Sequence, residues 1–547
     1  MANQKKQLPI GTDDFRKLRE QGNYYVDKTL FVQEFIENSM EVALITRPRR
    51  FGKTLNMTML REFFDITLDS SDIFNGLTIM STEYGMLINS RPVIYFSFKD
   101  SKGATIDELM YSISDVIYKE YKKYYVLLKD NVDESEPDYD RFFMLFEKLH
   151  VNNASMNELK RSIELLEQVL YNYYKSKPIV IIDEYDQPIM SSFEYGYHEH
   201  LQTFFSGLYG AALKGNGCLY KAVLTGIQRV VKESIFSQLN NLRVYTVIDE
   251  RFSDYFGLNT NETNDLLIYY GFALDESVKR QYNGYLFHKT QMYNPWSILN
   301  YADTGQLEDY WINTSTNYLI RQSINEADEY FMKNFDSLIA EDIAKVSVDL
   351  GCSFIELKHN DTLWGLLINA GYITVLERID KIFMKVRIPN GEVRFEFLRI
   401  IADRANIESI DLRNMFQCLL QKDFDGFLDI YRKIVISCTS FFDGKENAYH
   451  MLFLGMCITL NELYKISSNI ESGYGRSDIR MQSYSKERPH IVIEFKHGKD
   501  LDKLKNEALR QILVNKYYSG LKGEVLCLGI SHDKKKCGLA HEIITVD

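Results

Sequence analysis

Residues 41–64 have the pattern of a short apolar strand, a loop that ends in Gly-Lys-Thr, and an amphipathic helix. The apolar run covers residues 41–46, and apolar side chains recur three and four positions apart between residues 55 and 64. A loop in this setting can bind phosphate, because its backbone N–H groups and the helix N-terminus converge on the phosphate oxygens. The segment therefore predicts a nucleotide site of the Walker A type.

Each residue of the Gly-Lys-Thr sequence has a separate role in such a loop. Gly52 lets the backbone approach the phosphates closely, and Lys53 reaches the β- and γ-phosphates of ATP. The Thr54 hydroxyl is a ligand for Mg²⁺. These three residues are the predicted core of an ATP–Mg²⁺ site.

The first half of the loop departs from the common pattern. Arg47 stands where the motif has its first glycine, which serves the turn more than the phosphate chemistry. Arg47, Arg49 and Arg50 add positive charge around a bound polyanion, and Arg49 and Arg50 are predicted to bind the nucleotide. The alternative is a basic surface turn that happens to contain Gly-Lys-Thr.

Residues 178–186 form the second part of the predicted nucleotide site. Four consecutive β-branched residues precede Asp183 and Glu184, as in a strand buried on both faces of a parallel sheet. This is a Walker B pattern, in which Asp183 would hold Mg²⁺ through its water shell or through Thr54. Glu184 would orient or deprotonate the attacking water. The alternative is a solvated strand end.

Two further runs, residues 92–98 and 220–226, fit strands of the same sheet. Ligands of open parallel sheets bind beyond the carboxyl ends of the strands. Thr225 ends the second run, where a polar side chain can sense the γ-phosphate, and Arg229 follows four residues later. Both are candidate nucleotide-binding residues, although a plain surface arginine is the commoner role for a residue such as Arg229.

A second candidate site lies near the C-terminus, where residues 474–481 and 490–496 have the pattern of two neighbouring strands. Side chains alternate faces along a strand, so Glu494 and Lys496 share one face and Asp478 can join them from the other strand. Two carboxylates that bind divalent metal ions, with a lysine nearby, can activate water against a phosphodiester. The spacing D-x15-E-x-K is loose, and an exposed strand with ordinary surface charges is the alternative.

The elements around this group favour a restriction-endonuclease-like core. A helical pattern places Glu446 and His450 one turn apart. A charged amphipathic helix at residues 501–518 carries Gln511, and residues 524–530 form a further strand. The order helix, strand, strand, helix, strand is typical of that core.

Five segments taken together resemble one known family. They are NYYVDKT at 23–29, RPRRFGKT at 47–54, IDEYD at 182–186, LTGIQR at 224–229 and NPWS at 294–297. They are similar to the bacterial AAA-ATPase-like family, in which the ATPase is followed by a nuclease-like domain of the PD-(D/E)XK superfamily. In such proteins the loop commonly reads RPRRFGK, so the resemblance makes Arg47 a family variant. It also implies that residues 25–28 lie at the entrance of the nucleotide pocket.

The resemblance implies roles for the C-terminal residues as well. By motif position, Asp478, Glu494 and Lys496 are the catalytic core, and Glu446 is a supplementary metal ligand. Gln511 is a weaker supporting candidate. The predicted ion at Asp478 and Glu494 is Mg²⁺, with Mn²⁺ as a substitute.

Length and composition bound the architecture. With 547 residues and roughly 150 residues per domain, the chain should be multidomain. We expect an α/β protein with a P-loop AAA-ATPase-like domain built on a parallel sheet over residues 1–254. A helical or winged-helix-like middle region is expected over 255–440, and a restriction-endonuclease-like α/β domain of the PD-(D/E)XK type over 441–547. Trp296 and Trp364 are expected in the core, because nothing basic interleaves with them.

Charge and cysteine usage exclude several classes of protein. The formal net charge of -12 argues against non-specific coating of long nucleic acid, although it is compatible with a local basic groove. The lysines at 534–536 are more often a solvated charge run than a phosphate contact. The seven cysteines are scattered without a CxxC pair, so neither a disulfide framework nor a zinc cage is indicated. No secretion signal or apolar run of about 18 residues is present, so we expect a cytoplasmic protein without a membrane span.

The sequence supports two hypotheses of different classes. The first is an intracellular ATP-binding and ATP-hydrolysing protein whose ATPase domain controls a Mg²⁺-dependent nuclease-like domain acting on DNA or RNA. The second is a nucleotide-gated interaction protein whose C-terminal domain binds a partner or nucleic acid without cutting it. Both need ATP and Mg²⁺, and both are compatible with a homo-oligomer.

Overall fold

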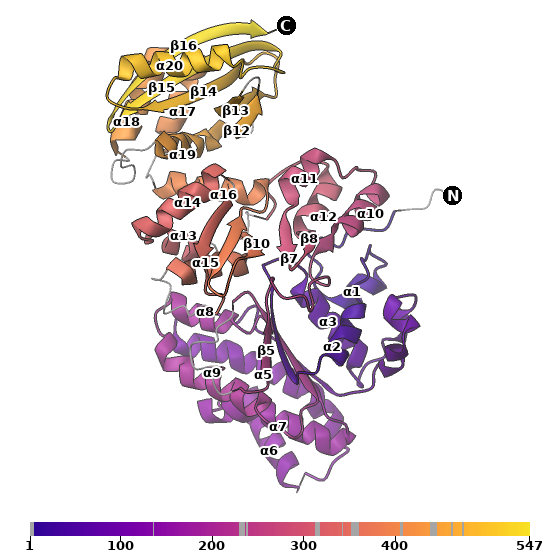
Figure 1. Ribbon diagram of the computed structural model, residues 1–547. Coiled ribbons are helices and arrows are strands. Elements are labelled where there is room, and N and C mark those ends of the chain that lie inside the picture. The colour runs from indigo at the N-terminus through magenta and orange to yellow at the C-terminus, as the bar shows by residue number, and fades with distance from the viewer. Residues whose placement is uncertain are drawn as a thin grey trace. The chain divides into compact units, whose positions relative to one another are not determined.

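The computed structural model describes residues 5–546 except 135, 229–235, 237–238, 312–317, 342, 352–359, 405–407, 438–445, 461–462 and 473–474. The chain divides into two compact units (Figure 1). The first comprises residues 1–326, 346–385 and 389–392, and the second comprises residues 327–345, 386–388 and 393–547. Each unit contains a five-stranded sheet.

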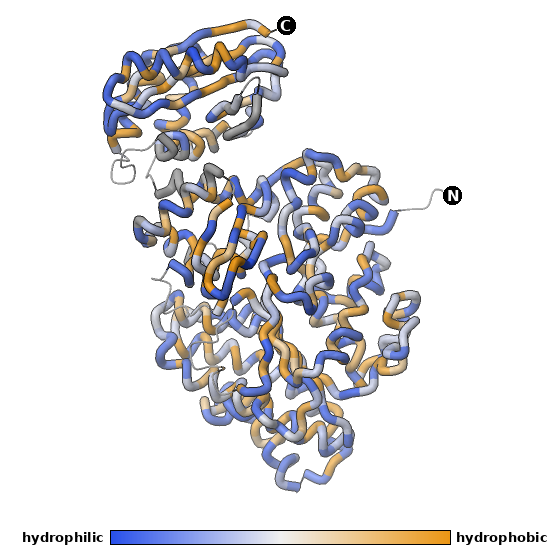
Figure 2. The backbone as a smooth tube through the Cα atoms, viewed as in Figure 1, coloured by the Kyte–Doolittle hydropathy of each residue, from blue (hydrophilic) through white to orange (hydrophobic). Residues whose placement is uncertain are grey.

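A parallel sheet forms the centre of the first unit. Its strands follow the order β2-β3-β4-β1-β5, and each neighbouring pair is parallel. Strands β1 and β3 are buried along their whole length, as expected for a parallel sheet covered on both faces. Figure 2 shows the corresponding apolar runs in orange. The strands are β1 (Val42–Thr46), β2 (Val93–Ser97), β3 (Ile179–Asp183), β4 (Lys221–Gly226) and β5 (Leu242–Tyr245).

Helices connect these strands and supply much of the apolar core of this unit. Helix α3 follows β1, and a capping box of Ser155 and Glu158 starts α7. The helices are α1 (Phe15–Glu20), α2 (Leu30–Glu37), α3 (Lys53–Phe64), α4 (Ser71–Phe74), α5 (Ile106–Leu128), α6 (Pro137–His150), α7 (Met156–Tyr174), α8 (Gln187–Glu194) and α9 (His198–Leu213), with the 3-10 turns η1 (Thr78–Ser81) and η2 (Glu83–Leu87).

The residues after β5 form small sheets and further helices. An antiparallel sheet has the order β6-β8-β7, and a second three-stranded sheet has the order β10-β11-β9. Helix α12 begins at Pro295, where the Asn294 side chain accepts from the Trp296 N–H. The elements are β6 (Leu258–Asn259), α10 (Thr260–Tyr270), α11 (Glu276–Tyr282), β7 (Tyr285–Phe287), β8 (Thr290–Tyr293), α12 (Pro295–Thr304), α13 (Tyr318–Asn325), β9 (Ile343–Ser347), α15 (Asn360–Ala370), β10 (Thr374–Arg378) and β11 (Phe383–Arg387).

A mixed sheet with the order β12-β13-β14-β15-β16 forms the centre of the second unit. Strands β14 and β15 pair in parallel, and the other neighbours pair antiparallel. Helix α20 packs on the face that carries Val492 and Val525. The elements are α14 (Glu329–Glu341), α16 (Gly391–Arg404), α17 (Ser409–Leu420), α18 (Phe424–Ser437), α19 (Glu446–Met456), η4 (Cys457–Leu460), β12 (Tyr464–Ser472), β13 (Gly475–Ser483), β14 (His490–His497), α20 (Leu501–Val514), β15 (Gly523–Asp533) and β16 (Lys536–Val546).

This architecture confirms the predicted fold class: a parallel α/β sheet, a helical middle region and a second α/β sheet near the C-terminus. Strands β12 and β16, which the sequence did not predict, extend the C-terminal sheet on both sides. Within the described residues, the helices include none with the length and apolar character that a bilayer span requires. The domain limits 1–254, 255–440 and 441–547 stay predictions.

Candidate functional site

The Gly-Lys-Thr loop connects β1 to α3, as the sequence predicts. Gly52 precedes the helix and has φ 81°, a left-handed conformation that glycine adopts without strain. A Cβ added at Gly52 would meet no atom within 4 Å, so the backbone angle and not space selects glycine here. The loop therefore places Lys53 in the first turn of a helix N-terminus, where a phosphate group is stabilised.

Lys53 is buried and folds back over the loop. Its Nζ donates to the carbonyl oxygens of Arg47 and Pro48, at 3.1 Å each. Burial lowers the pKa of Lys53, and the charges of Glu184 and Asp183 oppose that change. The Lys53 ammonium group thus interacts electrostatically with the acidic residues at the end of β3. A bound phosphate could replace the two carbonyl oxygens as its hydrogen-bond acceptors.

The Asp183 carboxylate joins three segments of the first unit. Its Oδ2 accepts from the Thr54 hydroxyl at 2.7 Å, and its Oδ1 accepts from the Thr225 hydroxyl at 2.6 Å. These residues lie at the end of β3, in the first turn of α3 and near the end of β4. Burial, followed by the charge of Glu184, raises the pKa of Asp183 to about 6. A carboxylate beside a hydroxyl at this edge of the sheet fits a Mg²⁺ ion that also keeps water and phosphate ligands.

Glu184 follows Asp183 with a backbone that is uncommon for its residue type. Its φ is 51°, in the left-handed region, and its side chain is partly exposed. Such a conformation costs on the order of 1–3 kcal/mol and is most frequent at functional sites. The turn directs the chain away from β3 immediately after Asp183. A partly exposed carboxylate here is suited to hold a water molecule beside a bound phosphate.

Asp186 is a residue of this site that the sequence analysis did not single out. Its Oδ2 accepts from the backbone N–H groups of Ile227 and Gln228, at 2.8 Å each. A Cβ on Gly226 would lie 2.6 Å from Asp186 Oδ1, so the turn after β4 passes very close to this carboxyl group. Asp186 therefore fixes the turn directly after Thr225. The signal for this residue in the sequence was its place as the second aspartate of the IDEYD segment.

Arg47 does not contribute charge to the phosphate side of the loop, contrary to the prediction. Its side chain is fully buried. One terminal nitrogen, Nη1, donates to the carbonyl oxygens of Thr46 (2.8 Å) and Tyr245 (3.2 Å), and Nη2 donates to that of Phe252 (2.9 Å). The guanidinium group is committed to backbone carbonyls because the long side chain turns into the core.

Other residues of the loop contact the segment around α12. The Arg50 guanidinium lies 3.7 Å from the centroid of the Trp296 ring, and Asn294 Nδ2 donates to the Arg49 carbonyl at 3.4 Å. Burial, then the neighbouring charge of Arg49, lowers the pKa of Arg50. Phe51 packs against the rings of β7 residues. These contacts give the NPWS segment a physical role, since it holds the predicted phosphate loop.

Asp27 is a structural clamp within the YVDK segment. Its two carboxylate oxygens accept four hydrogen bonds, two from Thr29 and two from Thr78, at 2.6–2.9 Å. Burial alone would raise the pKa of Asp27, but these four bonds outweigh it, and the pKa is lowered. The clamp ties the start of α2 to η1.

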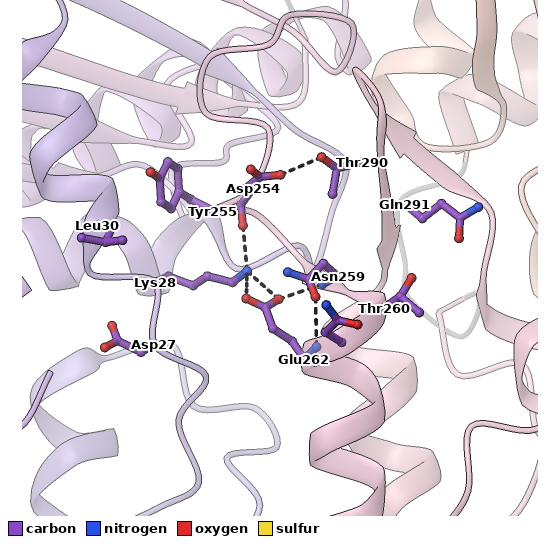
Figure 3. A pocket seen from close by; sticks show the side chains of 11 residues that line it. Asp27, Lys28, Leu30, Asp254, Tyr255, Asn259, Thr260, Glu262, Thr290 and Gln291 are labelled. Atoms are coloured by element: carbon purple, nitrogen blue, oxygen red, sulfur yellow. Dashed lines mark hydrogen bonds and ion pairs between the residues drawn. The ribbon is translucent and has the colours of Figure 1, made fainter. Parts of the chain in front are cut away.

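Lys28 lines a polar pocket of about 530 Å³ (Figure 3). Its Nζ donates to both carboxylate oxygens of Glu262, at 2.6 and 2.7 Å, and to the Asp254 carbonyl at 2.7 Å. Burial lowers the pKa of Lys28, and Glu262 opposes this. The wall beside it lies near α3, because Asn56 Nδ2 donates to the Tyr255 carbonyl at 2.9 Å. Whether residues 25–28 form the entrance of a nucleotide pocket stays a prediction.

Arg229, the remaining predicted nucleotide-binding residue, lies outside the described residues.

In the second unit, β13 and β14 bring the predicted nuclease residues together. The antiparallel register pairs Ile479 with Ile493, so Asp478 stands beside Glu494. The Asp478 N–H donates to Glu494 Oε2 at 3.4 Å, and Asp478 Oδ2 accepts from the Phe495 N–H at 2.7 Å. Asp478 and Glu494 therefore stand side by side across the strand pair, and each carboxyl group accepts from the backbone of the opposite strand.

Glu494 is also contacted by the other residues of the predicted group. Its Oε1 accepts from Gln511 Nε2 at 2.5 Å and from Lys496 Nζ at 3.4 Å. Burial, and next the charge of Asp478, raises the pKa of Glu494; burial also raises the pKa of Asp478. A buried carboxylate, Glu494, beside a partly buried one, Asp478, forms a site whose charge a divalent cation would neutralise.

Helix α20 can approach Glu494 closely because the residue beside Glu494 on β15 is Gly529, which has no side chain. The two residues pair in the parallel register of β14 and β15. A Cβ at Gly529 would lie 2.3 Å from the Lys505 carbonyl oxygen and 2.5 Å from the Leu509 nitrogen. Only glycine permits this approach of the helix backbone. The close packing positions Gln511 of α20 over the carboxylate.

Two residues of α19, Glu446 and His450, flank the predicted metal site. Glu446 is the first residue of α19, but its side chain lies outside the described part. His450 of the same helix is buried, and its ring centroid is 5.8 Å from that of Phe495, which faces away from Glu494 along β14. Among the side chains that the structure describes, no group of three or more His, Cys, Asp or Glu residues could hold a metal ion. Two carboxylates such as Asp478 and Glu494 can hold an ion that takes its other ligands from water or substrate, as Mg²⁺ does.

Comparison with known proteins identifies both domains. Residues 9–236 match the family model described as "Predicted AAA-ATPase", and residues 444–542 match the model of the PD-(D/E)XK nuclease superfamily. The chain contains an AAA-ATPase-like domain followed at its C-terminal end by a domain of the PD-(D/E)XK nuclease superfamily. It is also similar to the "Uncharacterized protein in vnfD 5'region" of Azotobacter chroococcum mcd 1. The two are 25% identical over 438 residues, which cover 78% of this chain and 77% of that protein.

Proposed function

We propose that this protein binds and hydrolyses ATP with Mg²⁺, and that its ATPase domain controls a metal-dependent nuclease-superfamily domain that acts on nucleic acid in the cytoplasm. The observation that carries the proposal is the pair of hydrogen bonds from Thr54 and Thr225 to Asp183. It joins the Walker A threonine, the Walker B aspartate and a polar strand end at one edge of a parallel sheet. An ordinary surface turn needs no such grouping.

In the proposed ATP site, the helix N-terminus behind Gly52 and the ammonium group of Lys53 receive the β- and γ-phosphates. Thr54 and Asp183 hold Mg²⁺, which neutralises phosphate charge when it is bound. Glu184 orients the attacking water and accepts its proton.

Further residues complete the proposed ATP site. Arg49 and Arg50 of the same loop supply positive charge near the phosphates, and Thr225 senses the γ-phosphate. The polar pocket around Lys28 lies on the side of the site where Tyr255 approaches α3, which supports its role as an entrance.

In the proposed nuclease site, Asp478 and Glu494 hold the metal ion, with Glu446 as a supplementary ligand. The ion supplies a bound water of lowered pKa and polarises the phosphodiester when it is present. Lys496 stabilises charge that develops on the phosphate, and Gln511 orients the Glu494 carboxylate by its hydrogen bond. Burial, and next the charge of Asp478, raises the pKa of Glu494, and a bound cation would offset the negative charge of this pair.

The ATP site is tested by calorimetry of ATP–Mg²⁺ binding to the full chain. Wild-type protein should bind saturably, and Lys53→Ala should abolish measurable binding because the phosphate contact is removed. Lys119→Ala is the matched control, since Lys119 is exposed on α5 and pairs with Asp115 on the surface. Saturable binding that survives Lys53→Ala unchanged would remove the loop from the proposal, and no binding by the wild type would end it.

The nuclease site is tested by incubating the full chain with single- and double-stranded DNA and RNA, with Mg²⁺ or Mn²⁺, in the presence and absence of ATP. Asp478→Ala and Glu494→Ala should each eliminate cleavage, because each deletes a charged ligand oxygen. Glu507→Ala, an exposed change on α20, should leave cleavage intact. If the wild type cleaves none of these substrates, the C-terminal domain is better explained as a nucleotide-gated binding module.

A further inference from the structure

Arg47 is a fully buried arginine whose hydrogen bonds go to neutral backbone carbonyls. Its guanidinium carbon also lies 5.3 Å from the centroid of the Phe256 ring and 5.4 Å from that of the Phe287 ring. A buried charge is costly unless its surroundings are fixed to receive it. The arrangement around Arg47 is such a receptor, built from carbonyl dipoles and aromatic faces.

Two of the three carbonyls that receive Arg47 belong to a different segment of the first unit. Tyr245 ends β5, and Phe252 lies in the irregular stretch between β5 and β6, with φ 61°. Phe256 lies in that same stretch, one residue before Gly257, whose added Cβ would meet the Phe51 ring at 2.8 Å. The side chain of Arg47 therefore attaches the beginning of the phosphate loop to residues 245–257.

The main chain of Arg47 is fixed at the same time. Its N–H donates to the Gly226 carbonyl at 3.1 Å, and its own carbonyl accepts from Lys53 Nζ at 3.1 Å. One residue thus connects the end of β4, the segment after β5 and the phosphate-binding lysine. If the guanidinium bonds are lost, the peptide that receives the lysine loses part of its support.

We propose that Arg47 is a positioning residue for Lys53. The Arg47 side chain sets the first turn of the phosphate loop, at the position where the common pattern uses a glycine. The proposal rests on the proposed ATP-binding function and adds the origin of its loop geometry. Arg47 itself does not touch the nucleotide. It acts through the carbonyl that it places beside Lys53 and through the attachment to residues 245–257.

The charge state of Arg47 is compatible with this role. Burial lowers the pKa of Arg47 to about 10, and the charges of Asp249 and Glu34 oppose the change. The side chain therefore keeps its charge at neutral pH. A lysine has a single compact ammonium group and cannot reach the three carbonyls with the same fork geometry, whereas a methionine fills similar space without any donor.

The test is ATP–Mg²⁺ and ADP affinity of the full chain for Arg47→Met, Arg47→Lys and Arg47→Gly, with Arg161→Met as control. Arg161 is an exposed arginine on α7 that pairs with Glu164 on the surface, so its loss changes charge without disturbing the loop. We expect about tenfold or greater weakening for the Met and Gly variants, because small misplacements of a binding group cost factors of ten to a hundred. The Lys variant should lose less. The glycine variant is informative because it restores the common motif and should nevertheless bind more weakly.

Affinity is measured at a temperature where tryptophan fluorescence shows each variant to be folded. A merely structural role would lower the unfolding midpoint and leave the dissociation constant of the folded protein unchanged, which contradicts the proposal. Wild-type protein that does not bind ATP would contradict the proposed function itself, a distinguishable result. In the wild type, hydrogen–deuterium exchange of residues 246–257 should slow when ATP–Mg²⁺ is added. Unchanged exchange in saturated protein also counts against the proposal, even if no variant folds.

Discussion

Replacing Asp183 by Asn should stabilise the ligand-free first unit at neutral pH while it abolishes Mg²⁺-dependent ATP binding. The pKa of Asp183 rises from 3.8 to about 6, chiefly through burial. Since one pKa unit corresponds to about 1.4 kcal/mol, the ionised carboxylate destabilises the folded unit by about 3 kcal/mol above pH 6. Asparagine removes that charge and can still hydrogen-bond to Thr54 and Thr225, because a hydroxyl both donates and accepts.

The sign of the pH dependence follows from the raised pKa. Between about pH 4 and 6 the folded unit binds the Asp183 proton and the unfolded chain releases it, so this group makes folding less favourable as pH rises. The stabilising effect of Asp183→Asn should therefore grow between pH 4 and 6 and level off above. The same carboxylate is a proposed Mg²⁺ ligand, so stability and ligand binding oppose one another at this position.

Tryptophan fluorescence suits the assay, because the three tryptophans, at 296, 311 and 364, all belong to the first unit. Denaturant unfolding at pH 5 and pH 8 should show a larger gain for Asp183→Asn at pH 8. Asp303→Asn, an exposed change in α12, should have little effect at either pH. A variant that is less stable than wild type at pH 8 would refute the reasoning from burial, and unchanged ATP–Mg²⁺ affinity would refute the assigned ligand role.

Three further changes have expected outcomes. Glu184→Gln should retain ATP binding by calorimetry and lose phosphate release, since it keeps the shape and Asp183 but removes the base; hydrolysis at the wild-type rate would exclude this role. Lys496→Ala should slow nucleic-acid cleavage and preserve Mn²⁺ binding, because an ammonium group is not a metal ligand; lost Mn²⁺ binding would contradict it. Gly529→Ala should destabilise the second unit by about 1–3 kcal/mol, because its Cβ would collide with the α20 backbone. Faster proteolysis of the second unit should detect this loss of stability, whereas the unfolding transition followed by tryptophan fluorescence should not change, because the tryptophans belong to the first unit. An unchanged proteolysis rate would show that α20 can shift to accommodate the methyl group.

Short-range patterns were sufficient to predict the local secondary structure around both candidate sites. The Gly-Lys-Thr loop and the apolar strand before Asp183 predicted a strand–loop–helix and a buried parallel strand, and both are present. Period-two alternation placed Glu494 and Lys496 on one face, and the hairpin brought Asp478 to them. These features follow from local geometry, which depends little on the remainder of the fold.

Features that depend on tertiary packing were not predictable from one sequence. The direction of the Arg47 side chain is set by carbonyls about 200 residues away in the chain. The clamp from Asp186 to the turn after β4 and the closeness of α20 to Gly529 likewise need the assembled sheets. The edge strand β12 has a polar sequence, KISSNIES after Tyr464, that carries little apolar alternation and therefore a weak strand signal.

The central claim, that ATP binding controls the nuclease-superfamily domain, is tested most directly by the cleavage rate of the full chain with and without ATP. The assay uses Mg²⁺, the substrate that the DNA and RNA screen identifies, and the variants Lys53→Ala and Glu494→Ala. We expect that ATP changes the wild-type rate, that Lys53→Ala still cleaves but no longer responds to ATP, and that Glu494→Ala does not cleave. A wild-type rate independent of ATP, or an ATP response that persists in Lys53→Ala, would contradict it.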